Sequence, residues 1–280
     1  MRKFVAFSLA PSGLFDRIIL KKKLSEIWET RLREAVECSD NDYLPRVAGA
    51  GMVKRGKQIM HNGLLINLGS YYGPEIARLL YENKGVHEPQ EERVFAEVLK
   101  AIPSNGTMIE LGSFWSFYSM WFKQKVDGAK NYMIEPDSFN IESGRRNFAL
   151  NGMEGDFTRA FVSGHSAKGD PRTICIDDFV KEKGIDFIDI LHSDIQGYEY
   201  EMLKGAVDTI RSKKIAYVFI STHTNEIHNN CLNFLRKHEF FIIANADLDT
   251  TYSQDGIIVG SAPFVDWNEK IPISQKGKPV

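Results

Sequence analysis

The chain has 280 residues, 43% hydrophobic and 26% charged, which is enough for one large domain or one domain with an appendage. Its 35 Lys and Arg residues nearly balance its 37 Asp and Glu residues. The resulting net charge of -2 gives no general attraction to the backbone of DNA or RNA, so we expect no nucleic-acid partner. An aromatic content of 11% argues against disorder over most of the chain.

No stretch approaches the roughly 20 consecutive apolar residues that a membrane-spanning helix needs. The first ten residues resemble a signal peptide, but their apolar run is short and ends at Pro11. Cys38, Cys175 and Cys231 are odd in number and far apart, which favours buried, reduced thiols over a disulfide framework or a zinc site. We therefore expect a cytoplasmic protein without stable membrane insertion.

The first 85 residues contain no motif that indicates a function. Apolar residues at helical spacing predict an amphipathic helix over 14–37, and a polar, Gly-containing segment predicts a loop over 39–56. Asn62-Gly63 lies between two apolar runs and predicts a β-hairpin over 57–67, because Gly accepts the positive φ of a tight turn. This extension is expected either to cover the carboxyl edge of a sheet or to form a homodimer contact.

Two helices that begin at Pro74 and Pro89 follow, and from residue 107 onward strands and helices alternate. The predicted strands are 107–111, 131–135, 157–162, 186–192, 215–221, 240–245 and 256–261. The predicted helices are 115–126, 138–150, 197–211 and 226–238, with a further short helix capped by Asp177 and Asp178. This alternation predicts an α/β fold with a mainly parallel sheet and helices on both faces, ending in a hairpin that contains one antiparallel strand.

The first predicted strand ends in Glu110, and Gly112 follows after one residue. Ligands of open parallel sheets bind beyond the carboxyl ends of the strands, and Gly lets the backbone turn tightly against such a ligand. The pattern G-x-G-x-x-G is absent, which argues against a pyrophosphate cradle. A glycine turn preceded by an acid suits a cationic ligand, such as an amino acid attached to a nucleoside; an ordinary strand-to-helix turn is the alternative.

Acidic and polar residues also follow the next two strands. Glu135 ends the second strand, where nucleotide-binding α/β sheets place an acid whose carboxylate accepts hydrogen bonds from both ribose hydroxyls. A helix N-cap or a surface acid is the alternative interpretation of Glu135. Ser163, directly after the third strand, is a further candidate for the same pocket.

Four segments carry a family resemblance. They are Glu110-Leu111-Gly112-Ser113 with Ser116, Phe117 and Tyr118; Ile134-Glu135-Pro136 with Asn147 and Asn151; Thr173-Ile174-Cys175-Ile176-Asp177-Asp178-Phe179; and the run 188–199 followed by Leu203-Lys204-Gly205-Ala206. The run 188–199 is the most specific of the four. With these segments, residues 86–261 resemble an FkbM-type S-adenosylmethionine-dependent methyltransferase.

The resemblance implies a class I methyltransferase-like, Rossmann-like fold with a seven-stranded sheet, over a domain at 86–280 that follows the extension at 1–85. It also implies S-adenosyl-L-methionine as the cofactor and O-methylation of a sugar, a glycan or a small natural product. The residues expected to bind the cofactor are Glu110, Gly112, Ser113, Ser116, Tyr118, Glu135, Ser163 and Asp194. Asn147 and Asn151 are interpreted as structural.

A hydroxyl acceptor gains from a base or a metal during attack. Asp194 and His223 are the first candidates for that base and His192 is the next, because all three lie near the carboxyl ends of the fourth and fifth strands. A divalent metal held by these three side chains is the alternative, since imidazole and carboxylate groups are suitable ligands.

The chain departs from the family pattern at four positions, which are Ser116, Gln196, His192 and Thr222. Ser116 stands where the first loop of the family has its last glycine, and Gln196 stands where the family has an acid. These departures leave open a non-catalytic, methyltransferase-like binding module. A nicotinamide-dependent oxidoreductase is a third reading, disfavoured by the absent G-x-G-x-x-G.

Overall fold

The computed structural model describes residues 24–277. Of the helix predicted over 14–37, the described part forms α2 (Glu26–Glu37); residues 14–23 and the signal-like first ten residues lie outside the described residues. Between residues 24 and 277, no helix is both long and apolar enough to span a membrane. Cys38, Cys175 and Cys231 are buried and unpaired, as the sequence indicates.

Residues 24–85 form a small layer that we call the cap. It contains α2, a 3-10 helix η1 (Ser39–Tyr43), α3 (Pro74–Glu82) and an antiparallel sheet of β1 (Val53–Lys54), β2 (Lys57–Ile59) and β3 (Leu65–Asn67). The predicted hairpin is confirmed, with Ile59 opposite Leu65 across the turn at Asn62-Gly63. β1 lies within the predicted loop, because a strand of two residues is too short to show a periodic pattern.

The main sheet has seven strands in the order β11-β12-β10-β9-β4-β5-β6. Their bounds are β4 (Thr107–Leu111), β5 (Lys130–Ile134), β6 (Asp156–Thr158), β9 (Ile188–Ser193), β10 (Ile215–Thr222), β11 (Phe241–Ala246) and β12 (Gly256–Ser261). Only β12 runs antiparallel to its neighbours β10 and β11. The predicted seven-stranded, mainly parallel α/β sheet and its C-terminal hairpin are confirmed.

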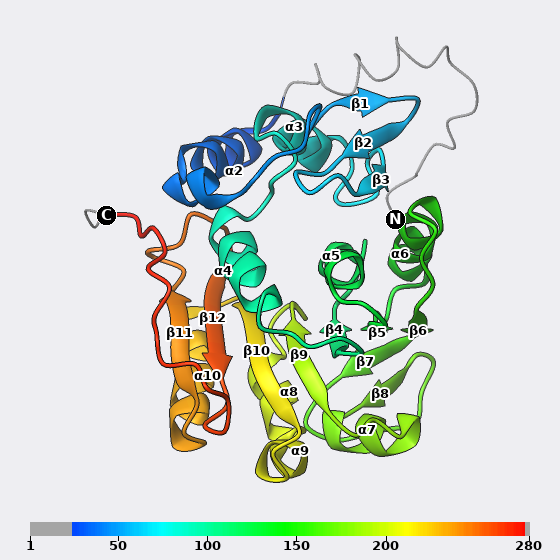
Figure 1. The fold of residues 1–280 in the computed structure, drawn as a ribbon, viewed down its shortest axis with the longest axis vertical. Helices are drawn as coiled ribbons and strands as arrows, with labels where there is room; N and C mark the ends of the chain where they lie inside the picture. The colour runs from blue at the N-terminus through cyan, green and yellow to red at the C-terminus, as the bar shows by residue number, and fades with distance from the viewer. Residues whose placement is uncertain (1–23, 278–280) are drawn as a thin grey trace.

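Helices cover both faces of this sheet (Figure 1). One face packs against α4 (Pro89–Leu99), α5 (Phe117–Lys125) and α6 (Ser138–Leu150), and the other packs against α7 (Ile176–Lys183), α8 (Glu199–Lys204), α9 (Val207–Arg211) and α10 (Asn225–Lys237). Side chains alternate between the faces along each strand. Met108 and Ile190 join the core under α4 and α5, whereas Ile109 and Leu191 join the core under the other helices.

Two elements predicted as continuous are each divided into two in the structure. The third predicted strand is divided into β6 and β7 (Ala160–Val162), and β7 pairs with β8 (Arg172–Ile174) in a separate two-stranded sheet. The helix predicted over 197–211 is broken into α8 and α9 at Gly205. A Cβ at Gly205 would lie 2.7 Å from the carbonyl oxygen of Ser163, so this close approach requires glycine.

The predicted capping role of Asp177 and Asp178 at α7 is wrong. The N-cap of α7 is Cys175, and both aspartates lie in the first turn of the helix. The Asp177 carboxylate instead accepts hydrogen bonds from the backbone N–H groups of Asp208 and Thr209, at 3.1 and 2.8 Å. It thereby binds the first turn of α9, a contact that depends on tertiary structure.

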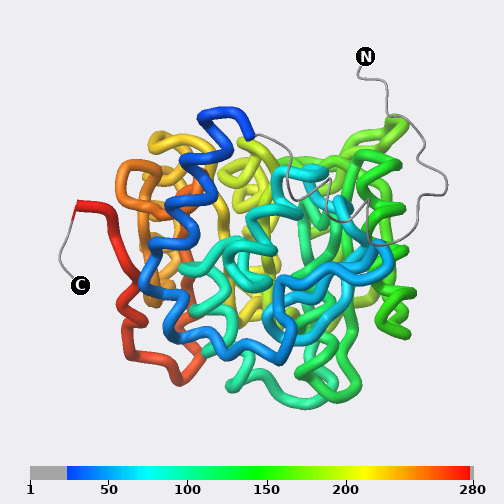
Figure 2. Tube along the Cα trace, turned by 90° about the horizontal axis from the view of Figure 1, so that it is seen from above, coloured from blue at the N-terminus to red at the C-terminus, as the bar shows by residue number. Residues whose placement is uncertain are grey.

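The cap lies across the carboxyl ends of the parallel strands, with α2 above β11 and β12 and with β1–β3 above α5 and α6 (Figures 1 and 2). Two asparagines of α6 connect it to the main domain. Asn147 Oδ1 accepts the backbone N–H of Asn67 at 2.9 Å, and Asn151 bonds both the N–H and the carbonyl oxygen of Leu65. Both asparagines are therefore structural, as the sequence analysis indicates.

We expect Asn147→Ala to reduce the free energy of unfolding by about 2–4 kcal/mol, because it leaves the half-buried N–H of Asn67 and the buried carbonyl oxygen of Trp115 without their partner. Urea unfolding measures this loss. Asn233→Ala, at an exposed position of α10, is the control and is expected to change stability by less than about 0.5 kcal/mol. Equal effects of the two substitutions would contradict the anchoring role of Asn147.

Candidate functional site

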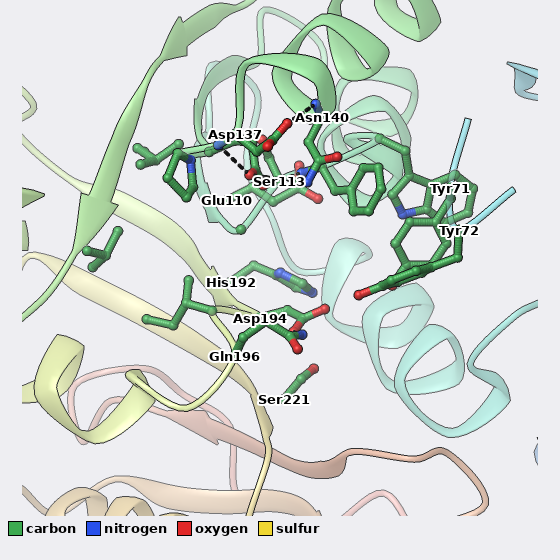
Figure 3. Close-up of a pocket in the computed structure, with 18 of the residues that line it drawn as sticks. Tyr71, Tyr72, Glu110, Ser113, Asp137, Asn140, His192, Asp194, Gln196 and Ser221 are labelled. Carbon is green, nitrogen blue, oxygen red and sulfur yellow. Dashed lines mark hydrogen bonds between the residues drawn. The ribbon is translucent and has the colours of Figure 1, made fainter. Parts of the chain in front are cut away.

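A cavity of about 2310 Å³ lies between the cap and the carboxyl ends of β4, β5, β9 and β10 (Figure 3). The cap contributes its residues 68–75, and the main domain contributes the turns that follow the strands. A pocket for one drug-sized ligand usually has about 300–1,000 Å³. This cavity therefore has room for two molecules side by side.

The alternation of the strands places Glu110, His192 and Ser221 on one face, at the edge below the cap. Glu110 of β4 is directly opposite His192 of β9 in the parallel register. Ser221 of β10 lies two residues after Phe219, the partner of His192 in the register of β9 and β10. Asp194 follows His192 by two residues, and all four of these polar side chains line the cavity.

Backbone contacts fix the conformation of the turn after β4. Gly112 has φ +71°, and a Cβ there would lie 1.8 Å from the carbonyl oxygen of Asp194. The N–H groups of Gly112 and Ser113 both donate to the carbonyl oxygen of Ile134, at 2.9 and 3.1 Å. Ser113 lines the cavity, and its buried Oγ has no hydrogen-bond partner in the structure.

Glu110 and Tyr118 line the cavity, but Ser116 does not. Ser116 is buried against Gly144 of α6 and has φ +59°, a conformation that glycine adopts more readily. The Glu110 carboxylate accepts the N–H of Ser119 in the first turn of α5, and burial raises its pKa to about 7. The hydroxyl of Tyr118 donates to Glu88 at 3.4 Å.

Glu135 lines the cavity directly after β5 and is only 5% exposed. Its carboxylate accepts the backbone N–H groups of Phe114 and Asp137, at 3.2 and 2.9 Å, and the side-chain amide of Asn140. Burial raises its pKa, while these donors favour the charged form. The N-cap of α6 is Asp137 rather than Glu135, so helix capping does not explain Glu135. Ser163 also lines the cavity.

One ring nitrogen of His192 is hydrogen-bonded, and the other has no hydrogen-bond partner. Its Nε2 lies 2.7 Å from Glu91 of α4, and the other oxygen of Glu91 accepts the hydroxyl of Ser221 at 3.0 Å. Nδ1 of the same ring is buried and has no hydrogen-bond partner. Burial disfavours the imidazolium, but Glu91 outweighs it and raises the pKa of His192.

His223 is engaged in a different cluster and does not line the cavity. Its Nδ1 lies 2.8 Å from Glu199, and its Nε2 lies 3.3 Å from Asp194 and 3.5 Å from Asp255. Burial opposes the positive charge, yet Asp194 and Glu199 raise the pKa of His223 to about 10. The sequence thus identified a residue that contacts Asp194 from outside the cavity.

The three side chains named for the metal alternative do not share a donor position. His192 is directed to Glu91, whereas His223 is held by Glu199 and Asp194. Among the residues that the structure describes, no group of three or more His, Cys, Asp or Glu side chains is arranged to hold a metal ion. His228, which follows the fifth strand in the sequence, is buried and bonded to Thr222 and Asn245.

Sequence reasoning missed a run of charged residues at the start of α4. His87 contacts Glu88 and Glu92, at 3.0 and 2.6 Å, and these acids raise its pKa to about 10 against the effect of burial. His87 and Glu88 line the cavity, and Glu91 binds His192. The acids by themselves gave no signal, because acidic residues are usual in the first turn of a helix and the partner of Glu91 lies 101 positions away.

The turn at Gly112 yields a stability prediction. We expect Gly112→Ala to lower the free energy of unfolding by at least about 2 kcal/mol more than Gly152→Ala, because only the former forces a backbone clash. Gly152 is a matched control, with φ +66° and no atom within 4 Å of the added Cβ. Urea unfolding compares the two, and equal losses would show that the approach of Asp194 is unimportant.

Comparison with solved structures gives low sequence identities. An O-methyltransferase from Bacillus cereus in complex with SAH has a TM-score of 0.44 and 11% identity over 63% of this chain and 82% of that chain. A methyltransferase from Geobacter sulfurreducens has a TM-score of 0.43 and 18% identity over 63% and 79% of the two chains. TrmK of M. capricolum, in complex with S-adenosyl-homocysteine, has a TM-score of 0.41 and 15% identity over 61% and 68%.

No curated protein matches the chain. A family model does match it, and the matched segment contains three of the candidate site residues. Residues 166–242, from the loop before β8 to the start of β11, match the methyltransferase FkbM domain. The resemblance to the FkbM-type methyltransferases is thereby confirmed over this segment, which includes His192, Asp194 and His223.

Proposed function

We propose that the protein is an S-adenosylmethionine-dependent O-methyltransferase that acts on a hydroxyl of a sugar, a glycan or a small natural product. The observation that carries the proposal is the large cavity, in which the glycine turn after β4 and the carboxylate after β5 lie at neighbouring strand ends. The cavity has room for a cofactor and an acceptor together. The cytoplasmic location and a homodimer stay predictions.

The residues around the turn suit this cofactor. Glu135 keeps acceptor capacity for a ribose hydroxyl, because its two oxygens have about four lone-pair positions and three protein donors. The unpartnered Ser113 Oγ and the Glu110 carboxyl suit the polar amino-acid end. When bound, the cofactor supplies a methyl group whose bond to sulfur breaks, with both electrons going to sulfur, as the acceptor oxygen binds the carbon.

The side chain that we assign as the base is His192, ahead of Asp194 and His223. With Nε2–H donating to Glu91, the lone pair of Nδ1 is left to accept the proton of the acceptor hydroxyl. Glu91 is fixed in turn by Ser221, so the orientation of the ring is set by two residues that do not contact the acceptor. Asp194 lies beside the acceptor space, and His223 positions Asp194.

Glu135→Gln is expected to weaken S-adenosylmethionine binding by about 10- to 100-fold, since it removes a charged acceptor from the ribose position. Isothermal calorimetry measures this affinity. Glu142→Gln, on the exposed side of α6, is the control and is expected to bind like the wild type.

The same titrations distinguish the alternatives. Unchanged affinity in Glu135→Gln, or preferential binding of NAD(H) by the wild type, would contradict the assignment of the cofactor site. Cofactor binding without methyl transfer to a panel of glycans and polyketides would favour the non-catalytic binding module.

The contact with Glu91 predicts how His192 titrates. The groups that raise its pKa are Glu91 of α4, Glu110 of β4 and Asp194, so we expect its pKa to lie above 6.5 in the wild type. A raised pKa keeps the ring protonated to higher pH, and His192 becomes available as a base only as the pH rises above it. In Glu91→Gln the effect of burial then dominates, and the pKa of His192 is expected to fall by about 1 unit or more.

Nitrogen-15 NMR of the imidazole nitrogens measures this titration without any acceptor. Glu142→Gln again serves as the control, and its His192 is expected to titrate like that of the wild type. A wild-type pKa below 6.5, or the same value in Glu91→Gln, would show that Glu91 does not control the ring.

A further inference from the structure

The lining of the cavity is acidic. Its carboxyl side chains are Glu75, Glu88, Glu110, Glu135, Asp137 and Asp194. Within residues 24–277, neither Lys nor Arg contributes to the lining. The charge of this space therefore depends on how each carboxylate is balanced by groups in the surrounding walls.

Most of these acids have protein partners that balance them. Glu88 is paired with His87 at 3.0 Å and with Arg31 at 3.8 Å, and His87 lowers its pKa to about 2 against the effect of burial. Asp137 caps α6. Glu110 and Glu135 accept backbone N–H groups on the side of the cavity assigned to the cofactor.

Asp194 accepts the side-chain amide of Gln196 at 3.1 Å, but it shares its charged partner with two other acids. Asp194, Glu199 and Asp255 all contact one imidazole, that of His223, so three carboxyl groups surround a single positive charge. Burial and the neighbouring Asp194 raise the pKa of Asp255 to about 7, as expected for acids that repel each other. The cavity wall at Asp194 thus favours a cation.

An aromatic wall, formed by Tyr71, Tyr72, Phe114 and Trp115, faces this acid. Tyr71 stacks on Trp115 with 4.6 Å between ring centroids, and Tyr72 meets Phe114 at 5.3 Å. Burial and Asp194 raise the pKa of both tyrosines, so the phenols stay neutral. Figure 3 shows Tyr71 and Tyr72 on one side of the cavity, and His192, Asp194 and Ser221 on the other.

His192 supplies an independent indication of a ligand between these walls. This residue lines the cavity and is only 3% exposed, yet Nδ1 has no hydrogen-bond partner. A buried ring nitrogen without a partner costs free energy unless a bound molecule satisfies it. The hydroxyl of an acceptor placed between Asp194 and the aromatic wall satisfies it.

We propose that the acceptor is a hydroxyl compound with a protonated amine, such as an amino sugar, whose ammonium binds Asp194 and the aromatic wall while its hydroxyl reaches His192. The faces of aromatic rings attract cations, and a carboxylate adds a direct ion pair. A phosphate or carboxylate on the acceptor brings like charge to Asp194 and is disfavoured. This inference rests on the proposed function, because it assigns the second molecule of the same cavity.

Three monosaccharide probes with the same ring test the inference. Calorimetry measures the affinity of the full chain, saturated with S-adenosylhomocysteine, for glucosamine, glucose and glucose 6-phosphate. We expect glucosamine to bind about tenfold more tightly than glucose, and glucose 6-phosphate to bind more weakly than glucose. Equal binding of glucosamine and glucose, or tightest binding of glucose 6-phosphate, would overturn the inference.

The preliminary titration with S-adenosylhomocysteine separates the two proposals. If that ligand does not bind, the proposed function fails. If it binds but glucosamine has no advantage over glucose, the proposed function survives and only the assignment of the acceptor fails.

Variants show which residues cause the preference for glucosamine over glucose. We express this preference as the ratio of the two affinities. We expect Asp194→Asn to reduce this ratio towards one and Glu142→Gln to leave it unchanged. Tyr72→Phe keeps the aromatic ring and is expected to keep the ratio, whereas Tyr72→Leu lowers it. A ratio that stays high in both Asp194→Asn and Tyr72→Leu would contradict this binding site.

Discussion

The buried ion pairs at the start of α4 are the interaction on which the cap, the sheet and the cavity depend. Glu92 has no exposed surface and lies 3.0 Å from His61 of the cap and 2.6 Å from His87. One residue earlier, Glu91 binds His192 at the edge of the sheet. Removing one partner of a buried pair is strongly destabilising, because the other charge stays buried. The same helix turn therefore fixes the cap and orients the proposed base.

The contacts around α4 also explain why residues distant in sequence meet. Gln90 bonds Ser274 near the C-terminus and Thr251 before β12, and Arg93 pairs with Asp40 of the cap at 2.6 Å. The polar side chains at this end of α4 thus bind the cap, the sheet and the C-terminal segment at once. Its apolar side packs on β9 and β10 through the core that contains Phe95.

The residues that line the cavity divide it into two chemically different parts. The turn at Gly112 and the carboxylate of Glu135 form the part that suits a nucleoside with a cationic amino acid. The part between Asp194 and Tyr72 is lined by the cap, so the segment of the sequence without any motif shapes the space proposed for the acceptor. This is consistent with a common sheet that binds the cofactor and an extension that selects the second substrate.

The sequence by itself determined the sheet, because the alternation of apolar strands with helices allows few arrangements, and it identified Gly112, Glu135 and His192 as residues at strand ends. Only the tertiary structure decided which polar groups face the cavity. Ser116 lies in the first motif segment and His223 follows a strand end, yet Ser116 packs against α6 and His223 contacts Asp194 from outside the cavity. The local sequence pattern determines where along a strand a residue lies. The residues that its side chain contacts belong to elements far away in the chain. For that reason the pairing of Glu91 with His192, which joins residues 101 positions apart, has no local signature.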